Sequence, residues 1–175
     1  MKVKKHFSIF IIMGLVYLVM EVFNRWVGGA MVGYEIADMT QSMVSATGWT
    51  SFWMLLVGGL CGLLLGKMNE WKCTNKLPVL VQAIIGTLLI VLPLEFSSGI
   101  ILNIWLKLGI WDYSNNFANL LGQICLQNGL MFMAICPFAF WLDDVLRHYI
   151  YDEKKPSPLY KFYVRIFTDF AKIKG

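Results

Sequence analysis

Long uninterrupted runs of apolar residues are the feature that most constrains the fold of this chain. A helix needs about 20 residues, at about 1.5 Å each, to cross about 30 Å of hydrocarbon. Four runs reach or approach that length, at 7–27, 49–66, 77–105 and 117–142. The composition agrees, because 58% of the residues are hydrophobic and only 15% are charged, against about 25% charged in soluble domains. We therefore predict an all-α, polytopic membrane bundle of four transmembrane helices.

The distribution of basic residues sets the expected orientation. Lysines precede the first run, a second group lies between the second and third runs, and a third group follows the fourth run. The other two loops carry one basic residue each, Arg25 and Lys107. Because positive residues are retained on the cytoplasmic side, we predict a multi-pass protein of the cell (cytoplasmic) membrane with both termini in the cytoplasm. This distribution also explains the net charge of +4 without a nucleic-acid partner.

The last residues of the chain change in character. We expect residues 1–142 to form the transmembrane domain and residues 143–175 a cytoplasmic polar linker followed by a C-terminal amphipathic helix. The apolar residues of this tail recur with a helical period and would therefore share one face of a helix. These residues are Leu159, Phe162, Tyr163, Ile166, Phe167 and Phe170. A basic helix with such a face lies at a membrane interface. Docking to a cytoplasmic partner would use the same face.

Two glutamates, Glu21 and Glu95, lie inside predicted spans. A carboxylate at the bilayer centre costs about 2.5–3.5 kcal/mol, and such residues usually face a bundle interior or a cavity. The predicted orientation puts both in the outer half of the membrane. Together they could serve as a cation site, a proton relay or an acid/base pair. The structural alternatives are a hydrogen bond between helices and, for Glu21, an ion pair with Arg25 at i,i+4.

A second group of polar residues surrounds the loop before the fourth run. The segment 111–117 is rich in aromatic and hydrogen-bonding residues, and Asn119, Gln123 and Gln127 follow at helical spacing. Amides in hydrocarbon need partners, so an outward-facing polar pocket is one reading and hydrogen bonding between helices the other. The candidate ligand-binding residues are Glu21, Asn24, Glu95, Trp111, Asp112, Tyr113, Ser114, Asn115, Asn119 and Gln123.

Small residues in the second run predict close helix packing. Gly58, Gly62 and Gly66 form a ridge at four-residue spacing, which lets two helices approach closely within the bundle or between copies of the chain. The sequence Gly66-Lys67 is not a phosphate-binding loop, because the first glycine and the Ser or Thr of that motif are missing. We expect no nucleotide or other cofactor.

No pattern of catalytic or metal-ligating residues is found. His6 and His148 lie at opposite ends of the chain, and the four cysteines form no C-x-x-C pair. Signatures of hydrolases, zinc proteases and dinucleotide-binding enzymes are also missing. We therefore predict no metal and no catalytic residue, and an enzymatic role is disfavoured.

The stretch from Pro93 to Leu142 resembles a known family. The residues that carry the resemblance are Pro93-Leu94-Glu95-Phe96, Gly99, Trp111-Asp112-Tyr113-Ser114, Asn119, Gly122, Ile124, Cys125 and Leu126. They are similar to the signature of the putative type IV ABC-transporter permease family, also called CmpB-like, which includes many small bacterial membrane proteins. The resemblance implies a membrane permease and draws attention to Glu95, to the W-D-Y-S run and to Asn119.

These observations lead to one functional hypothesis and two alternatives. The leading hypothesis is a small transporter or permease-like subunit whose outward pocket is built around the carboxylates of Glu21 and Glu95. The alternatives are a membrane enzyme acting on a lipid or lipid-linked substrate, with Glu95 and Asp112 as acid and base, and a non-catalytic assembly or regulatory subunit. The expected partners are membrane lipid, further copies of the chain, and a partner ATPase or other membrane subunit.

Overall fold

Helices form almost all of the regular structure in the part of the chain that is described. The computed structural model describes residues 2–32, 35–36, 39–40 and 50–173, with the side chains of residues 4–26 and 50–169. The helices are α1 (Lys2–Val32), α2 (Trp53–Glu70), α3 (Val79–Gly86), α4 (Leu92–Gly99), α5 (Leu126–Tyr151) and α6 (Leu159–Ile173), with the π-helical segments η1 (Thr87–Val91) and η2 (Ile100–Trp105). Two short antiparallel strands, β1 (Glu35–Ile36) and β2 (Met39–Thr40), pair in the connection between α1 and α2.

Three helical stretches of the described residues are long and apolar enough to cross a membrane. They are Lys4–Trp26, Val79–Trp105 and Leu126–Tyr151. A helix that is apolar on all sides is typical of a membrane span, so the chain is a helical membrane protein. Helix α2 is not one of these stretches, and the expected start of the second span at Trp49 lies outside the described residues.

The third apolar run is a continuous rod built from α3, η1, α4 and η2. Just before Pro93 the rod contains the π-helical segment η1, and the Leu92 N–H donates to the Thr87 carbonyl five residues back. A proline has no N–H to donate and its ring clashes with the carbonyl four residues earlier, and the wider π turn before it accommodates both defects. The rod therefore continues through Pro93 and carries Glu95 in α4.

The predicted start of the fourth span at Phe117 is wrong. Helix α5 begins at Leu126, after the extended residue Cys125. Residues 106–125 instead form a folded loop, in which Ala118 and Leu121 have φ values of 51°. Positive φ is incompatible with a right-handed helix, so the expected helical stripe of Asn119, Gln123 and Gln127 does not form. At its other end α5 continues past Leu142 to Tyr151.

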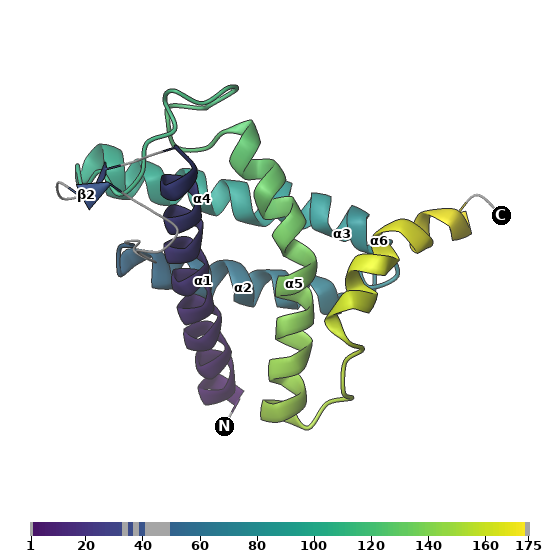
Figure 1. Ribbon diagram of the computed structural model, residues 1–175. Helices are drawn as coiled ribbons and strands as arrows, with labels where there is room; N and C mark the ends of the chain where they lie inside the picture. The colour runs from purple at the N-terminus through teal and green to yellow at the C-terminus, as the bar shows by residue number, and fades with distance from the viewer. Residues whose placement is uncertain (1, 33–34, 37–38, 41–49, 174–175) are drawn as a thin grey trace.

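In the view of Figure 1, α1 and α5 run from top to bottom at the front, and α2 and the α3–α4 rod cross behind them. Helix α1 packs mainly against α2, whereas α5 packs against α2, α3 and α6. Glycines set the approach of α1 to α2, because a Cβ on Gly62 would lie 2.7 Å from Met13 Cβ, and a Cβ on Gly59 would lie 2.6 Å from the Phe10 carbonyl oxygen. Gly58 of α2 faces Tyr17 of α1, whereas Gly66 of α2 faces Asp143 of α5.

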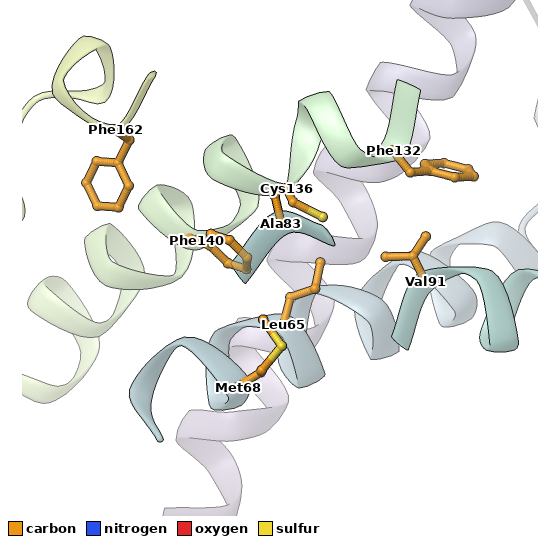
Figure 2. Packing of buried hydrophobic residues seen from close by; sticks show 8 residues of the cluster. All are labelled: Leu65, Met68, Ala83, Val91, Phe132, Cys136, Phe140 and Phe162. Carbon is orange, nitrogen blue, oxygen red and sulfur yellow. The ribbon is translucent and has the colours of Figure 1, made fainter. Parts of the chain in front are cut away.

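The main hydrophobic core joins five elements. One cluster contains Leu65 and Met68 of α2, Ala83, Val91, three residues of α5 and Phe162 of α6. Figure 2 shows these side chains. A second, smaller cluster forms around Trp111 of the loop, with Met54, Leu102 and Ile110. The first cluster secures α6 to the bundle and the second secures the loop.

The helices have two distinct ends. We call the end that carries residues 106–125, the last turns of α1 and the start of α2 the loop end, and the opposite one the tail end. At the tail end the start of α1 meets the end of α5, since Lys5 Nζ lies 4.9 Å from the centre of the Tyr151 ring. There Arg147 of α5 is bonded to Glu70 of α2 and lies 3.4 Å from Asp143. The pair of Arg147 with Glu70 joins the ends of α2 and α5.

Candidate functional site

A cavity of about 920 Å³ lies at the loop end. Its walls come from α1, α4, the loop 106–125 and the first turns of α5. Six residues of the candidate ligand-binding set line it together, and they are Glu21, Asn24, Glu95, Trp111, Asp112 and Tyr113. Ser114, Asn115, Asn119 and Gln123 do not line this cavity. The cavity thus unites polar residues from four segments with a wall that is otherwise largely apolar.

Glu21 is held in a network of hydrogen bonds on the α1 side. The Arg25 Nη2 atom donates to Glu21 Oε1 at 2.8 Å and to the Ile110 carbonyl at 3.1 Å. The Thr50 hydroxyl donates to the other oxygen, Glu21 Oε2. The ion pair expected from the i,i+4 spacing is therefore present, and Arg25 also ties α1 to the loop. Both carboxylate oxygens of Glu21 have a partner.

Glu95 lies deeper in the cavity, on α4, and is only 3% exposed. Tyr113 of the loop lines the same cavity. Burial and, secondly, the Glu95 carboxylate raise the pKa of the Tyr113 phenol, so the tyrosine keeps its proton and remains a donor. Glu95 is thus a buried acid beside an open space, in contrast to the ion-paired Glu21.

The W-D-Y-S run forms the mouth of the cavity as a hydrogen-bonded turn. Asp112 Oδ1 accepts from the Ser114 N–H at 2.8 Å and from the Ser114 hydroxyl at 2.5 Å. The hydroxyl and then the backbone N–H hold the pKa of Asp112 below its ordinary value, so this exposed carboxylate is ionised at neutral pH. Asn119 closes the turn from the other side, because its Nδ2 donates to the Ser114 carbonyl at 3.0 Å. Ser114 and Asn119 therefore shape the loop behind Asp112.

Gln123 and Trp111 connect the loop to the rod. The Trp111 indole N–H donates to the Gln123 carbonyl at 3.0 Å, and Asn103 of η2 donates to Gln123 Oε1 at 2.9 Å. Asn103 also accepts from the Ile110 N–H at 2.7 Å. Gln123 is buried and has structural partners, and Asn115 is exposed on the loop.

The cavity also contains residues that sequence reasoning did not identify. Tyr17 and Asn128 line it, and Thr50 completes the network of Glu21. Tyr17 precedes Glu21 by one helical turn, so the spacing Tyr17-Glu21-Arg25 was a usable signal. Asn128 lies in the first turn of α5, and it could be placed in the cavity only once the true start of that helix was known.

A smaller void of about 70 Å³ adjoins the cavity and extends it toward the tail end. Tyr17, Met20, Glu95, Phe132 and Ile135 line both spaces. The rest of the void is apolar, with walls from α1, α2 and α5 that include Met13, Val16, Cys61, Leu65, Ala139 and Leu142. Glu95 therefore lies where the polar mouth gives way to an apolar track.

A second polar region is present at the tail end. A cavity of about 520 Å³ is lined by Arg147, Arg165, Asp144 and other polar residues of α2, α3, α5 and α6. The side-chain oxygen of the buried Gln82, which also lines it, has no hydrogen-bond partner in the described residues. Asn69 donates to Asp144 at 3.3 Å across this region. The two polar cavities occupy opposite ends of the helices.

Among the described residues, no three His, Cys, Asp or Glu side chains are grouped as metal ligands would be. The chemistry of the loop-end cavity is that of three carboxylates, Glu21, Glu95 and Asp112, against one guanidinium, Arg25. Such an arrangement favours a cation, and the rings of Trp111 and Tyr113 add faces that attract positive charge.

Comparison with known proteins identifies the family. No curated protein and no solved structure shows significant similarity to this chain. Residues 57–170 match the family described as "Putative ABC-transporter type IV", which covers well over half of the chain. Together with the apolar helices, this match makes the chain a transporter-related membrane protein and a member of the type IV, CmpB-like ABC-transporter family.

Proposed function

We propose that the chain is a small transporter or permease-like subunit that binds a cation, or the cationic group of a solute, in the loop-end cavity. The observation that carries the proposal is the position of Glu95, a carboxylate that is 3% exposed yet borders a cavity of about 920 Å³. A buried carboxylate is costly inside a membrane, and residues that bear this cost usually serve an ion or substrate path.

The roles of the remaining lining residues follow from their contacts. Glu21 is neutralised by Arg25, so it positions α1 against the loop rather than meeting the ligand. Asp112 supplies negative charge at the mouth, and Trp111 and Tyr113 supply ring faces and a hydroxyl. Asn24 and Asn128 complete the polar part of the wall. Glu95 is the primary ligand-binding residue in this scheme.

The orientation belongs to the proposal. We place the loop end outside and the tail end in the cytoplasm, with α2 as a fourth, short span beside the three longer ones. The basic residues support this, since Lys67, Lys72, Lys76 and those after Leu142 gather at the tail end while the loop end has Arg25 and Lys107. Helix α6 would lie in the cytoplasmic interface with the exposed part of its apolar face, which includes Phe167, toward lipid, while Phe162 remains in the main core.

The family description supports further subunits. An ABC transporter couples a membrane part to an ATPase, and no nucleotide-binding motif is found in this sequence. A partner ATPase would bind at the tail end, and further copies of the chain could complete the membrane part. The test of this element is co-purification of an ATPase with the full chain and its loss when residues 159–175 are removed.

Uptake into liposomes tests the proposed function directly. The probe is radiolabelled methylammonium, with protein-free liposomes to subtract passive leak. Glu95→Gln removes the charge but keeps the shape, so we expect at least a ten-fold loss of uptake. The matched control is Asp152→Asn. Asp152 is an exposed acid at the tail end, and asparagine tolerates the left-handed backbone conformation at this position. Unchanged uptake in Glu95→Gln would refute the proposed role of this residue.

A further inference from the structure

We infer that the cationic group recognised by the loop-end cavity is the amine headgroup of a membrane lipid, whose acyl chain lies in an apolar groove between α1 and α5. This inference rests on the proposed function and specifies its substrate class. Three features of the described residues support it, namely the continuity of the two cavities, the side on which they open, and the separation of polar from apolar walls.

The cavity and the inner void form one track. They share five lining residues, including Tyr17 of α1, Glu95 of α4 and Phe132 of α5. From Asn128 at the mouth to Leu142 at the far end of the void, the α5 wall rises about 21 Å at about 1.5 Å per residue. One leaflet of a bilayer is about 15 Å of hydrocarbon. The two spaces together therefore extend along α5 for the length of a lipid acyl chain, and the cavity of about 920 Å³ supplies most of their volume, since the void adds about 70 Å³.

In addition to its polar mouth, the track is open at its side, toward lipid. Val19 and Phe23 line the cavity from α1 and are nevertheless 69% and 57% exposed, so this wall is open at its side. Both residues belong to the apolar stretch Lys4–Trp26, which faces hydrocarbon in the proposed arrangement. A molecule that enters between α1 and α5 at this depth comes from the bilayer.

The walls separate a headgroup from a tail. The carboxylates of Glu95 and Asp112 and the guanidinium of Arg25 lie at the loop end, while the void beyond Glu95 is lined by side chains such as Met13, Val16 and Ile135. The mouth has an excess of carboxylates, so an amine-bearing headgroup complements it and a purely anionic headgroup does not.

Photocrosslinking in proteoliposomes tests the inference. Two lipid probes carry the same diazirine-labelled acyl chain, one with a phosphatidylethanolamine and one with a phosphatidylglycerol headgroup. We expect the ethanolamine probe to label peptides 13–20 and 135–142 about ten-fold more than the glycerol probe, a ratio that corresponds to about 1.4 kcal/mol. Leu88 and Leu89, which are exposed on η1 outside both cavities, report ordinary lipid contact and should be labelled equally by both probes.

Variants locate the two parts of the site. Glu95→Gln and Asp112→Asn should reduce the preference for the ethanolamine probe, and Ile135→Phe should reduce labelling of the groove by both probes. Leu88→Phe adds the same kind of bulk to the outer surface and should change neither. Equal groove labelling by the two probes in the unmodified protein would overturn the inference.

The methylammonium assay separates the two levels of the proposal. Glu95-dependent uptake of methylammonium together with unselective groove labelling would leave the proposed function standing and overturn the lipid inference. Loss of both signals would overturn both. Selective labelling that Glu95→Gln abolishes would support the inference.

Discussion

At the scale of the residue, glycines decide how closely α1 and α2 approach. A Cβ added to Gly62 would lie 2.7 Å from Met13 Cβ, an atom fixed to the α1 backbone. Gly14 of α1 meets Leu55 of α2 in the same way. These contacts let the two backbones approach closely, which is the main source of helix association in a membrane. They also fix the position of Tyr17, which packs on Gly58 and lines the cavity.

Gly62→Ala tests this contact. Alanine favours a helix more than glycine does, by about 1 kcal/mol, so a loss of stability can come only from the close approach. We expect a net destabilisation of about 1–3 kcal/mol from overpacking, measured as a lower midpoint of thermal unfolding in detergent.

Gly129→Ala on α5 is the matched control, because its new Cβ would lie at an ordinary 3.7 Å from Leu92. This variant should be neutral or slightly stabilising. Equal behaviour of the two variants would contradict the proposed role of the α1–α2 contact.

Some residue-scale relations could be predicted from the sequence and others could not. The Glu21–Arg25 ion pair follows from i,i+4 spacing alone. The partners Thr50 and Ile110 belong to distant segments, and no local spacing reveals them. The same holds for Tyr113 and Glu95, which line one cavity only because the loop folds back over the rod.

At the scale of the element, the periodicity of the sequence wrongly predicted helix in part of the loop 106–125. Asn119 and Gln123 have helical spacing, yet their amides bond to carbonyls and amides of the same loop and of the rod. Gly122 has a φ of 68° and lies against Ser114 and Asp112. The loop contains apolar residues just before Leu126, so the apolar run of the sequence begins earlier than α5 does. Hydropathy alone therefore places the start of the helix too early.

Gly122→Ala tests the loop. Two costs are expected, the left-handed backbone of alanine at about 1–2 kcal/mol and a clash with Ser114 and Asp112. Gly109→Ala carries the first cost alone, because its φ is also positive but no described atom lies within 4 Å of its added Cβ. We therefore expect Gly122→Ala to lower the thermal midpoint and cation binding more than Gly109→Ala does. Similar losses in the two variants would show that the packing of Gly122 is unimportant.

Helix α6 uses its apolar residues in two ways. Phe162 is 7% exposed and belongs to the main core, whereas Phe167 is 79% exposed. We expect Phe162→Ala to destabilise the protein by about 3–5 kcal/mol and Phe167→Ala to leave the unfolding midpoint unchanged. In liposome flotation of an isolated peptide of residues 157–175, Phe167→Ala should instead weaken binding if this face contacts lipid. A large fall in the midpoint of Phe167→Ala would contradict this division.

At the scale of the whole molecule, the described elements sort into two ends of different charge. The tail end combines the start of α1, the loop between α2 and α3, the end of α5 and α6, and holds most of the basic residues. The basic loops predicted that most basic residues would share one end, because this signal is local and repeated. The cavity itself could not be predicted in shape, since it depends on how α1, α4 and α5 pack.

Cysteine labelling tests the proposed orientation. Cys73 is exposed in the loop after α2, and Cys61, Cys125 and Cys136 are buried. A membrane-impermeant maleimide should label Cys73 in inside-out vesicles and not in intact cells. In a Cys73→Ser background, Asn115→Cys at the exposed loop end should give the reverse result. Labelling of Cys73 in intact cells would invert the orientation.

The glycine contact of α1 with α2 has a mechanical consequence. Helix α1 packs mainly on α2 and has little contact with α5, and the contacts of α2 with α5 include Gly66 with Asp143 and Glu70 with Arg147 at the tail end. The cavity lies between α1 and α5 at the loop end, away from these contacts. A change in its width should therefore separate α5 from α1 while the α1–α2 pair moves as a unit, so the distance between Val16 and Ile135 would report the opening and the distance between Met13 and Gly62 would stay constant.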